Sequence, residues 1–319
     1  DHGGISIKLS ALHPRFELRQ EVALDTLFER LMELLLLAQE KDIAVTIDAE
    51  ESWRLEPTLM LFSRAMGHNR LRHWGKLGLA VQAYQKRAPA LIQWLMDVSK
   101  TLHCQIPVRL VKGAYWDTEI KRAQIEGVDG FPVFTSKAAT DISYIATARK
   151  LLSMTDRIYP QFATHNAHTV ASIRILAEQY KAQHYEFQRL HGMGESLYDH
   201  LLDGYEDVRC RIYAPVGPYR ELLPYLVRRL LENGANTSFV RQIQLARSDG
   251  SWLIEEPSAN IRAMERLRNP KIPLPRRVFQ PQRKNALGCN LEEPPEPHEG
   301  CRIGSGGGLG LLPVRSRSE

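Results

Sequence analysis

Charged and aromatic residues directly after one apolar segment give the first indication of a binding site. Residues Ile106–Val111 are mostly apolar and β-branched, which is typical of a buried β-strand, yet Arg109 lies inside the segment. A charge in a buried strand is costly unless a polar or oppositely charged group meets it. The strand is followed by a lysine, by a glycine that lets the backbone turn or approach a ligand, and by two flat rings. These residues are Lys112, Gly113, Tyr115 and Trp116. The pattern predicts the floor of a site for a planar, anionic ligand; a strand with two solvent-reaching charges is the alternative.

The segment Pro218–Gly234 has the pattern of a helix and carries a second candidate site. Four of its polar residues are spaced i, i+3, i+4 and i+7, which places them on one face. They are Tyr225, Arg228, Arg229 and Glu232. Two adjacent guanidinium groups can hold a carboxylate in a fork geometry, so the pattern predicts a carboxylate clamp. An exposed helix with an Arg–Glu pair across one turn is the alternative. The opposite face is expected to bind the helix to the domain through Leu223, Leu226, Val227, Leu230 and Leu231.

A strand end and two lysines could also carry chemistry. The run Thr164–Asn166 ends a predicted strand and precedes a helix, so His165 and Thr164 could bind an anion at the helix N-terminus. A plain N-cap is the alternative. No HExxH motif and no third ligand accompany the histidine, so we expect no metal. Lys8 and Lys112 could each be a Schiff-base nucleophile, but cations and anions are mixed here, which favours charge pairing.

The elements that must position these residues alternate between strand and helix. Seven strands are predicted at Ile5–Ala11, Ile43–Asp48, Leu77–Tyr84, Ile106–Val111, Ile158–His165, Tyr185–Leu190 and Val208–Pro215. Polar residues gather toward their C-terminal ends, where a (β/α)₈ barrel places its active site: Lys8, Asp48, Gln82, Arg109, Lys112, His165 and Tyr213. A doubly wound sheet is the alternative, but no GxGxxG follows a strand. The sequence therefore predicts a distorted (β/α)₈ barrel of the α/β class, apparently without its first βα unit in this chain.

Composition narrows the class of protein. The chain has 319 residues, a net charge of +5 with basic residues scattered among acidic ones, and four cysteines without a CxxC pair. We therefore expect no nucleic-acid groove, no zinc site and a reducing, cytoplasmic location, with loose attraction to an anionic membrane surface possible in principle. Residues 1–270 are predicted to form the barrel. Residues 271–319, rich in Pro, Glu and Gly, are expected to be a tail or linker, disordered toward its end.

Seven motifs resemble the proline dehydrogenase family, and most closely that domain of the bacterial bifunctional proline utilisation proteins. The motifs occupy residues 6–15, 48–51, 81–87, 108–117, 162–169, 211–217 and 225–240, so the resemblance covers about Gly4–Asn290. It implies a barrel that holds FAD and oxidises L-proline to Δ1-pyrroline-5-carboxylate by hydride transfer to flavin N5. It also implies electron transfer to a membrane quinone, and an aldehyde dehydrogenase domain in the full-length protein.

The resemblance also assigns roles to individual residues. It places the proline carboxylate on Lys8, Arg228 and Arg229, and makes Arg109, Lys8 and Asp48 catalytic. It places the proline ring among Asp48, Tyr115, Leu190, Tyr213 and Tyr225. It places FAD against Gln82, Arg109, Val111, Lys112, Gly113, Trp116, Thr135, Lys137, Thr164 and His165. In the family an aspartate-bearing strand precedes the strand that contains Lys8, and here that aspartate-bearing strand is absent. An inactive fragment unable to hold FAD is therefore the alternative, beside the Schiff-base lyase.

Overall fold

Seven parallel strands form one sheet whose spatial order is the order of the sequence. The structure is a computed structural model, and it describes residues 3–16, 21–234, 262 and 268–286. Each strand pairs in parallel with the next one along the chain. The strands are β1 Gly4–Ile7, β2 Ala44–Ile47, β3 Leu77–Gln82, β4 Ile106–Val111, β5 Ile158–Ala163, β6 Glu186–Leu190 and β7 Cys210–Tyr213. Sequential parallel order is the topology of a (β/α) barrel, so the predicted fold class is confirmed.

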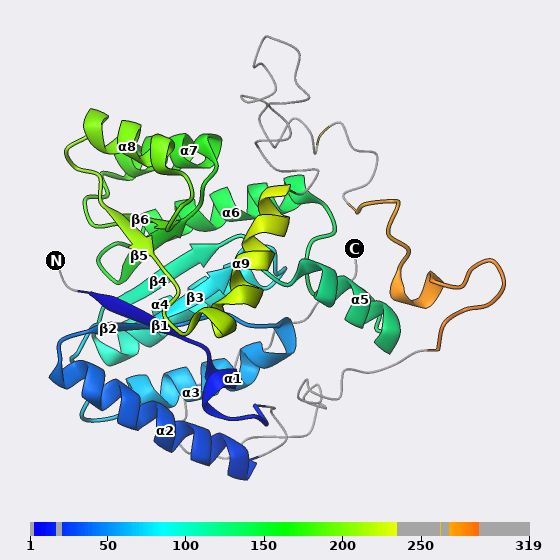
Figure 1. The fold of residues 1–319 in the computed structure, drawn as a ribbon, viewed down its shortest axis with the longest axis horizontal. Coiled ribbons are helices and arrows are strands. Elements are labelled where there is room, and N and C mark those ends of the chain that lie inside the picture. Colours follow the sequence, from blue (N-terminus) through cyan, green and yellow to red (C-terminus); the bar gives the residue numbers. More distant parts are fainter. Residues whose placement is uncertain (1–2, 17–20, 235–261, 263–267, 287–319) are drawn as a thin grey trace.

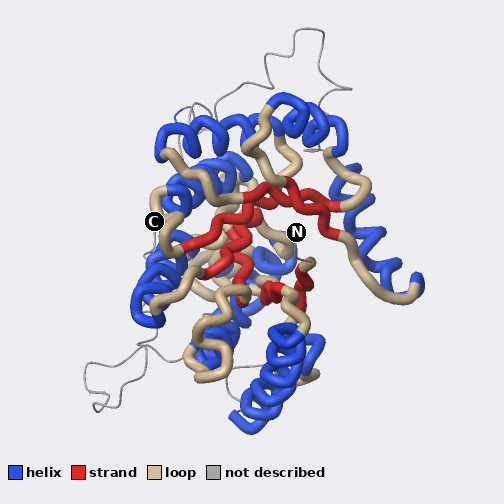
Figure 2. The backbone as a smooth tube through the Cα atoms, turned by 90° about the vertical axis from the view of Figure 1, so that its left-hand side faces the viewer, coloured by secondary structure: helices blue, strands red, loops and turns tan. Residues whose placement is uncertain are grey.

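Helices separate the strands and cover the outside of the sheet. Figure 2 shows the strands curving into an arc with helices on its convex side, and Figure 1 shows the elements in sequence order. The helices are α1 Leu9–Leu12, α2 Glu21–Glu40, α3 Leu55–Met66, α4 Ala88–Leu102, α5 Trp116–Glu126, α6 Lys137–Leu152, α7 Ala167–Tyr180, α8 Glu195–Gly204 and α9 Tyr219–Gly234, with short 3₁₀ turns at Ser52–Arg54 and Pro275–Arg277. The inner face of the arc is left for the polar residues at the strand ends.

The alternation along β4 shows how the sheet separates apolar from polar groups. Ile106, Val108 and Leu110 are fully buried and belong to the main apolar core. Arg109 and Val111 alternate with them on the other face and are half-buried. Successive side chains of a strand point to opposite faces, so β4 places its arginine inside the arc while Ile106, Val108 and Leu110 pack outward.

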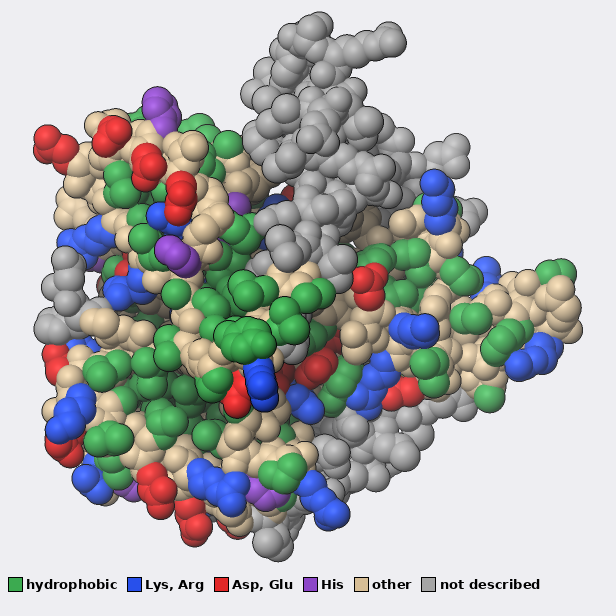
Figure 3. Space-filling view, in the orientation of Figure 1, with side chains coloured by type: hydrophobic (Ala, Val, Ile, Leu, Met, Phe, Trp, Pro, Cys, Tyr) green, Lys and Arg blue, Asp and Glu red, His purple; other side chains and the backbone are tan. Residues whose placement is uncertain are grey.

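Several expected strand ends and one expected helix face were wrong. The strands expected to reach Tyr84, His165 and Pro215 end at Gln82, Ala163 and Tyr213. The strand expected at Ile5–Ala11 ends at Ile7, because the chain turns into α1 where the Ser10 N–H binds the Glu50 carboxylate at 3.0 Å. The apolar face of α9 was expected to pack inward, but its described leucine and valine side chains are about half exposed, while Tyr225 is half-buried. Figure 3 shows apolar side chains gathered over α9 on this face. The exposed residues are Leu223 (53%), Leu226 (49%) and Val227 (45%); the side chains of Leu230 and Leu231 lie outside the described residues.

Residues 268–286 pack against α5. Ile272 and Leu274 contact the small apolar cluster that includes Ile120 and Val133. The side-chain amide of Asn285 donates to the Gln124 carbonyl at 3.0 Å. The boundary at residue 270 stays a prediction, and residues 287–319 lie outside the described part of the chain. None of the described helices is both long and apolar enough to cross a lipid bilayer.

Close strand packing at Gly78 leads to a test of the sheet. A Cβ at Gly78 would lie 2.7 Å from the carbonyl oxygen and 2.9 Å from the Cβ of Pro107 on β4. We expect Gly78→Ala to lower the free energy of unfolding by about 1–3 kcal/mol, because the two strands would have to move apart. Urea unfolding measures this. Gly130→Ala, where no heavy atom lies within 4 Å, is the control; an equal effect of both substitutions would contradict the packing argument.

Candidate active site at the C-terminal ends of the strands

The strand ends bring the predicted residues to one edge of the sheet. Lys8 and Asp48 directly follow β1 and β2; Gln82, Leu190 and Tyr213 are the last residues of β3, β6 and β7. Arg109 and Val111 lie in β4, and the loop and helix after it carry Lys112, Gly113, Tyr115 and Trp116. Thr135 and Lys137 lie at the start of α6, Thr164 and His165 follow β5, and Tyr225, Arg228 and Arg229 lie in α9. Hydrogen bonds and ring contacts connect several of these residues.

Arg109 is the centre of the described contacts. Its Nε donates to the Gln188 side-chain oxygen at 2.6 Å, and one Nη donates to Asp48 at 2.9 Å. Its guanidinium carbon also lies 5.4 Å from the centre of the Tyr213 ring. The charge in β4 is therefore met by one carboxylate, one amide and one ring face, as the cost of a buried charge requires.

Asp48 is held between two cations. Burial raises the pKa of its carboxyl, while Arg109 and then Lys8 lower it and Glu50 raises it, so that the net shift is upward. The backbone N–H of Asp48 donates to the Ile7 carbonyl at 2.8 Å, which fixes the start of the loop after β2 against the end of β1. Lys8, Asp48 and Arg109 thus form one cluster with two positive groups and one carboxylate.

A buried chain of hydrogen bonds extends from Arg109 into β6. The Gln188 amide nitrogen donates to Glu186 at 2.7 Å, so the amide oxygen faces Arg109. Glu186 is 3% exposed and also accepts from Gln161 at 3.1 Å and from the Arg211 Nε at 2.9 Å. Sequence reasoning missed Gln188 and Glu186, since nothing in the sequence of β6 marks its amide as the partner of an arginine in β4.

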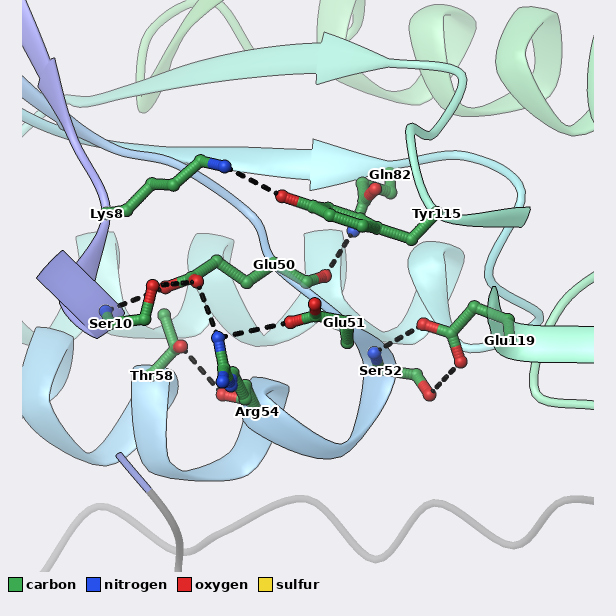
Figure 4. A network of polar contacts seen from close by, with 10 residues as sticks. All are labelled: Lys8, Ser10, Glu50, Glu51, Ser52, Arg54, Thr58, Gln82, Tyr115 and Glu119. Carbon is green, nitrogen blue, oxygen red and sulfur yellow. Dashed lines mark hydrogen bonds and ion pairs between the residues drawn. The ribbon is translucent and has the colours of Figure 1, made fainter. Parts of the chain in front are cut away.

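Lys8 meets the aromatic loop after β4. Its Nζ donates to the Tyr115 hydroxyl at 3.0 Å (Figure 4). The Gln82 side-chain nitrogen donates to the Glu50 carbonyl at 2.8 Å, and its oxygen accepts the Ala114 N–H at 3.2 Å. Both polar atoms of Gln82 are therefore used to hold loops, which differs from a purely ligand-facing amide.

Two lysines share one carboxylate at the start of α6. Lys112 and Lys137 bind the two oxygens of Asp141, Lys137 at 2.9 Å. Burial raises the pKa of Asp141, but Lys112 and Lys137 together lower it by more, so the net shift is downward. Burial lowers the pKa of Lys112 despite this partner. With both lysines protonated the group carries one net positive charge, which suits an anion. Asp141 was also missed by sequence reasoning.

The loop after β4 is shaped by ring packing. Gly113 has a φ of +144°, and a Cβ there would lie 2.5 Å from the Tyr84 ring, so the loop needs glycine. The Trp116 indole N–H donates to the Phe134 carbonyl at 2.8 Å. These contacts therefore fix the loop after β4 and the Trp116 indole in place.

The end of β5 is capped and tied to β6. Asn166 is the N-cap of α7, with its side-chain oxygen accepting the Thr169 N–H at 2.8 Å. The Thr164 hydroxyl accepts the Asn166 N–H at 3.2 Å. The His165 Nε2 accepts the Leu190 N–H at 3.0 Å, so this nitrogen is unprotonated while the bond holds. The capping alternative for this motif is thus confirmed for Asn166.

The clamp residues lie on a described helix, but their side chains lie outside the described residues. Arg228 and Arg229 follow Tyr225 by three and four positions in α9, which places them on its face. Tyr225 is half-buried. Thr135 is buried, and its hydroxyl accepts the Asn269 N–H at 3.0 Å. Among the described residues, no group of three His, Cys, Asp or Glu side chains could hold a metal ion.

The shared carboxylate gives a test with a defined pH dependence. We expect Asp141→Asn to lower the free energy of unfolding by about 1.5–3 kcal/mol near neutral pH, because half-buried Lys112 loses its charged partner. The folded-state pKa of Asp141 lies below its usual 3.8, so its contribution is present above that pH and is lost as the pH falls through the folded pKa. Chemical unfolding at several pH values should show the difference between the two proteins shrinking below pH 3.8.

Lys137→Gln is the control for this test. Lys137 binds the same carboxylate from an exposed position, and exposed pairs contribute about 1 kcal/mol or less. A loss for Asp141→Asn that is no larger than the loss for Lys137→Gln, or one that grows as the pH falls, would contradict the assignment.

Comparison with known proteins agrees with this geometry. The sequence profile of the proline dehydrogenase family matches residues 1–242. The chain is 50% identical over 304 residues to the bifunctional protein PutA of Escherichia coli, covering 90% of this chain and 23% of that protein. It is 30% identical over 238 residues to proline dehydrogenase 1 of Bacillus subtilis, covering 74% of this chain and 68% of that protein. The chain therefore spans about a quarter of the length of PutA and two thirds of the shorter enzyme.

Solved structures show the same fold. A crystal structure of a Bradyrhizobium japonicum PutA variant superposes with a TM-score of 0.85 at 50% identity, covering 89% of this chain and 29% of that one. The PutA of Bdellovibrio bacteriovorus, in a structure inactivated by N-propargylglycine, superposes with a TM-score of 0.75 at 32% identity, covering 80% of this chain and 27% of that one. The barrel architecture, the ordered motifs and these matches together show that the chain belongs to the proline dehydrogenase family.

Proposed function

We propose that this chain oxidises L-proline to Δ1-pyrroline-5-carboxylate with FAD as its cofactor. The observation that carries the proposal is the cluster of Lys8, which follows β1, Asp48, which follows β2, and Arg109 in β4 of a proline dehydrogenase fold. Two cations around one carboxylate leave a net positive charge in a half-buried position. Such a cluster favours an amino acid bound through its carboxylate.

The residues present fit a flavin dinucleotide. Lys112 and Lys137 share the single carboxylate of Asp141, so this part of the edge keeps an excess positive charge for a pyrophosphate. The Trp116 indole is fixed by its hydrogen bond to the Phe134 carbonyl. No described contact uses the second Nη of Arg109, which leaves a donor for a ring system. The residues proposed to hold FAD are those assigned by resemblance: Gln82, Arg109, Val111, Lys112, Gly113, Trp116, Thr135, Lys137, Thr164 and His165.

Bound FAD would supply the two-electron acceptor for the hydride that leaves the proline carbon beside the amine, at flavin N5. The chain's own residues would then bind and orient the substrate. Lys8, Arg228 and Arg229 hold the carboxylate; Asp48, Tyr115, Leu190, Tyr213 and Tyr225 surround the ring. The Lys8–Tyr115 hydrogen bond places a carboxylate-binding cation beside a pocket wall, which limits the orientations open to proline.

Arg109 has a separate role in this proposal. Its side chain is 11% exposed and is fixed by two hydrogen bonds, so its charge is preorganised. A fixed cation stabilises negative charge that develops nearby during the reaction, without reorganisation. We propose that electrons then pass to a membrane quinone, that the protein is cytoplasmic and peripheral to the membrane, and that the full-length protein carries an aldehyde dehydrogenase domain.

The clamp gives the direct test of this function. We expect Arg228→Met or Arg229→Met to raise the KM for proline by about ten- to a hundred-fold, because a charge-assisted hydrogen bond contributes about 1.5–3 kcal/mol. Flavin content, read from the visible absorbance, should stay normal. A dye-reduction assay at varied proline concentration measures the effect.

Arg220→Met is the matched control, since Arg220 is an exposed arginine at the start of the same helix. Normal proline kinetics in both clamp variants, or loss of flavin in place of proline affinity, would contradict the clamp. Failure of the unaltered chain to bind added FAD would favour an inactive fragment. Borohydride trapping of an aldehyde on Lys8 or Lys112 would favour a Schiff-base lyase.

A further inference from the structure

We propose that Glu50 is a positioning residue that holds Lys8 and Tyr115 together from both sides. The proposal rests on the proposed function, in which Lys8 holds the substrate carboxylate. Glu50 is 6% exposed and lies in the loop after β2. Figure 4 shows it between the segment that carries Lys8 and the loop that carries Tyr115.

The side chain of Glu50 fixes the backbone that follows Lys8. One carboxylate oxygen accepts the Ser10 N–H at 3.0 Å, and the other accepts the Ser10 hydroxyl. Ser10 lies two residues after Lys8, which is the extended residue just before α1. Because Lys8 has a long side chain, a small rotation of this backbone would move its Nζ by a much larger distance. Anchoring Ser10 therefore sets the direction from which Lys8 reaches the site.

The backbone of Glu50 fixes the other partner. Its carbonyl accepts the Gln82 side-chain N–H at 2.8 Å, and the Gln82 oxygen accepts the Ala114 N–H at 3.2 Å. Ala114 directly precedes Tyr115, whose hydroxyl accepts from Lys8. The contacts form a closed circuit. It runs from the Glu50 side chain through the segment Lys8–Ser10 to Tyr115, and from Ala114 through Gln82 back to the Glu50 carbonyl. Each link in such a circuit restricts the others.

Glu50 acts through geometry rather than as a charge presented to the substrate. Its second oxygen also accepts from Arg54 at 2.8 Å, so its carboxylate is already paired. Both oxygens are occupied by described partners, and the side chain is buried. Glu50 therefore has the contacts and the burial expected of a residue that orients Lys8.

Labelling of Lys8 tests the positioning without substrate or cofactor. The full chain is treated with a limiting acylating reagent, and modification of Lys8 is quantified by peptide mass spectrometry relative to exposed Lys121. We expect Glu50→Ala to raise the relative labelling rate of Lys8 by about fivefold, which corresponds to the loss of about one hydrogen bond that restrains it. Ser10→Ala, which keeps the Ser10 N–H contact, should give a smaller rise in the same direction.

Two controls separate positioning from general loosening. Glu56→Ala removes another half-buried glutamate, one that pairs with Arg87 at 3.0 Å, and it should leave Lys8 labelling unchanged. If Glu50→Ala does not fold, Ser10→Ala decides the outcome alone. Unchanged Lys8 labelling in a folded Ser10 or Glu50 variant, or an equal rise in Glu56→Ala, would overturn the proposal.

Kinetics then show whether the positioning serves proline binding. We expect Glu50→Ala to raise the KM for proline with kcat changed less than about twofold, and to have no further effect in a Lys8→Met background. If Lys8→Met leaves KM unchanged, the role of Lys8 in the proposed function is wrong, while the labelling result still decides the positioning. If Lys8→Met raises KM and Glu50→Ala raises it independently, Glu50 does not act through Lys8 and the proposal fails.

Discussion

A positive charge inside β4 is the constraint on which the rest of the site depends. Arg109 lies in a strand whose neighbouring residues are fully buried, so its guanidinium needs polar partners within the sheet. Asp48 comes from the end of β2, and Gln188 comes from β6, on the two sides of the arginine. Gln188 is in turn oriented by Glu186. The charge of Arg109 thereby fixes polar residues after β2 and within β6.

Cations in the loops beyond the strands are also held by polar partners. Lys112 and Lys137 are held by a single aspartate, and Lys8 is held by a tyrosine hydroxyl. In each case the protein supplies less negative charge than positive. This excess of positive charge supports the proposed binding of anionic ligands.

The sequence predicted the architecture better than it predicted the contacts. Alternation of strands and helices gave the parallel sheet, because hydrophobic periodicity depends on residues close in the chain. The end of β1 was misplaced, because the chain enters α1 where Ser10 binds the buried Glu50, which is 40 residues away in the sequence. Gln188 was missed because its partner is 79 residues distant. The face of α9 was misjudged because an apolar stripe does not say which side of a helix the domain covers.

The sequential strand order has a consequence for synthesis on the ribosome. Each strand pairs with the one made just before it, so the sheet can grow as the chain emerges. The site contacts join residues much farther apart: Asp48 precedes Arg109 by 61 positions, and Gln188 follows it by 79. At about 5–20 residues per second, Arg109 waits roughly 4–16 s for its second partner. During that interval Arg109 can bind Asp48 but not Gln188, so the first strands of the sheet form before the contacts of the site are complete.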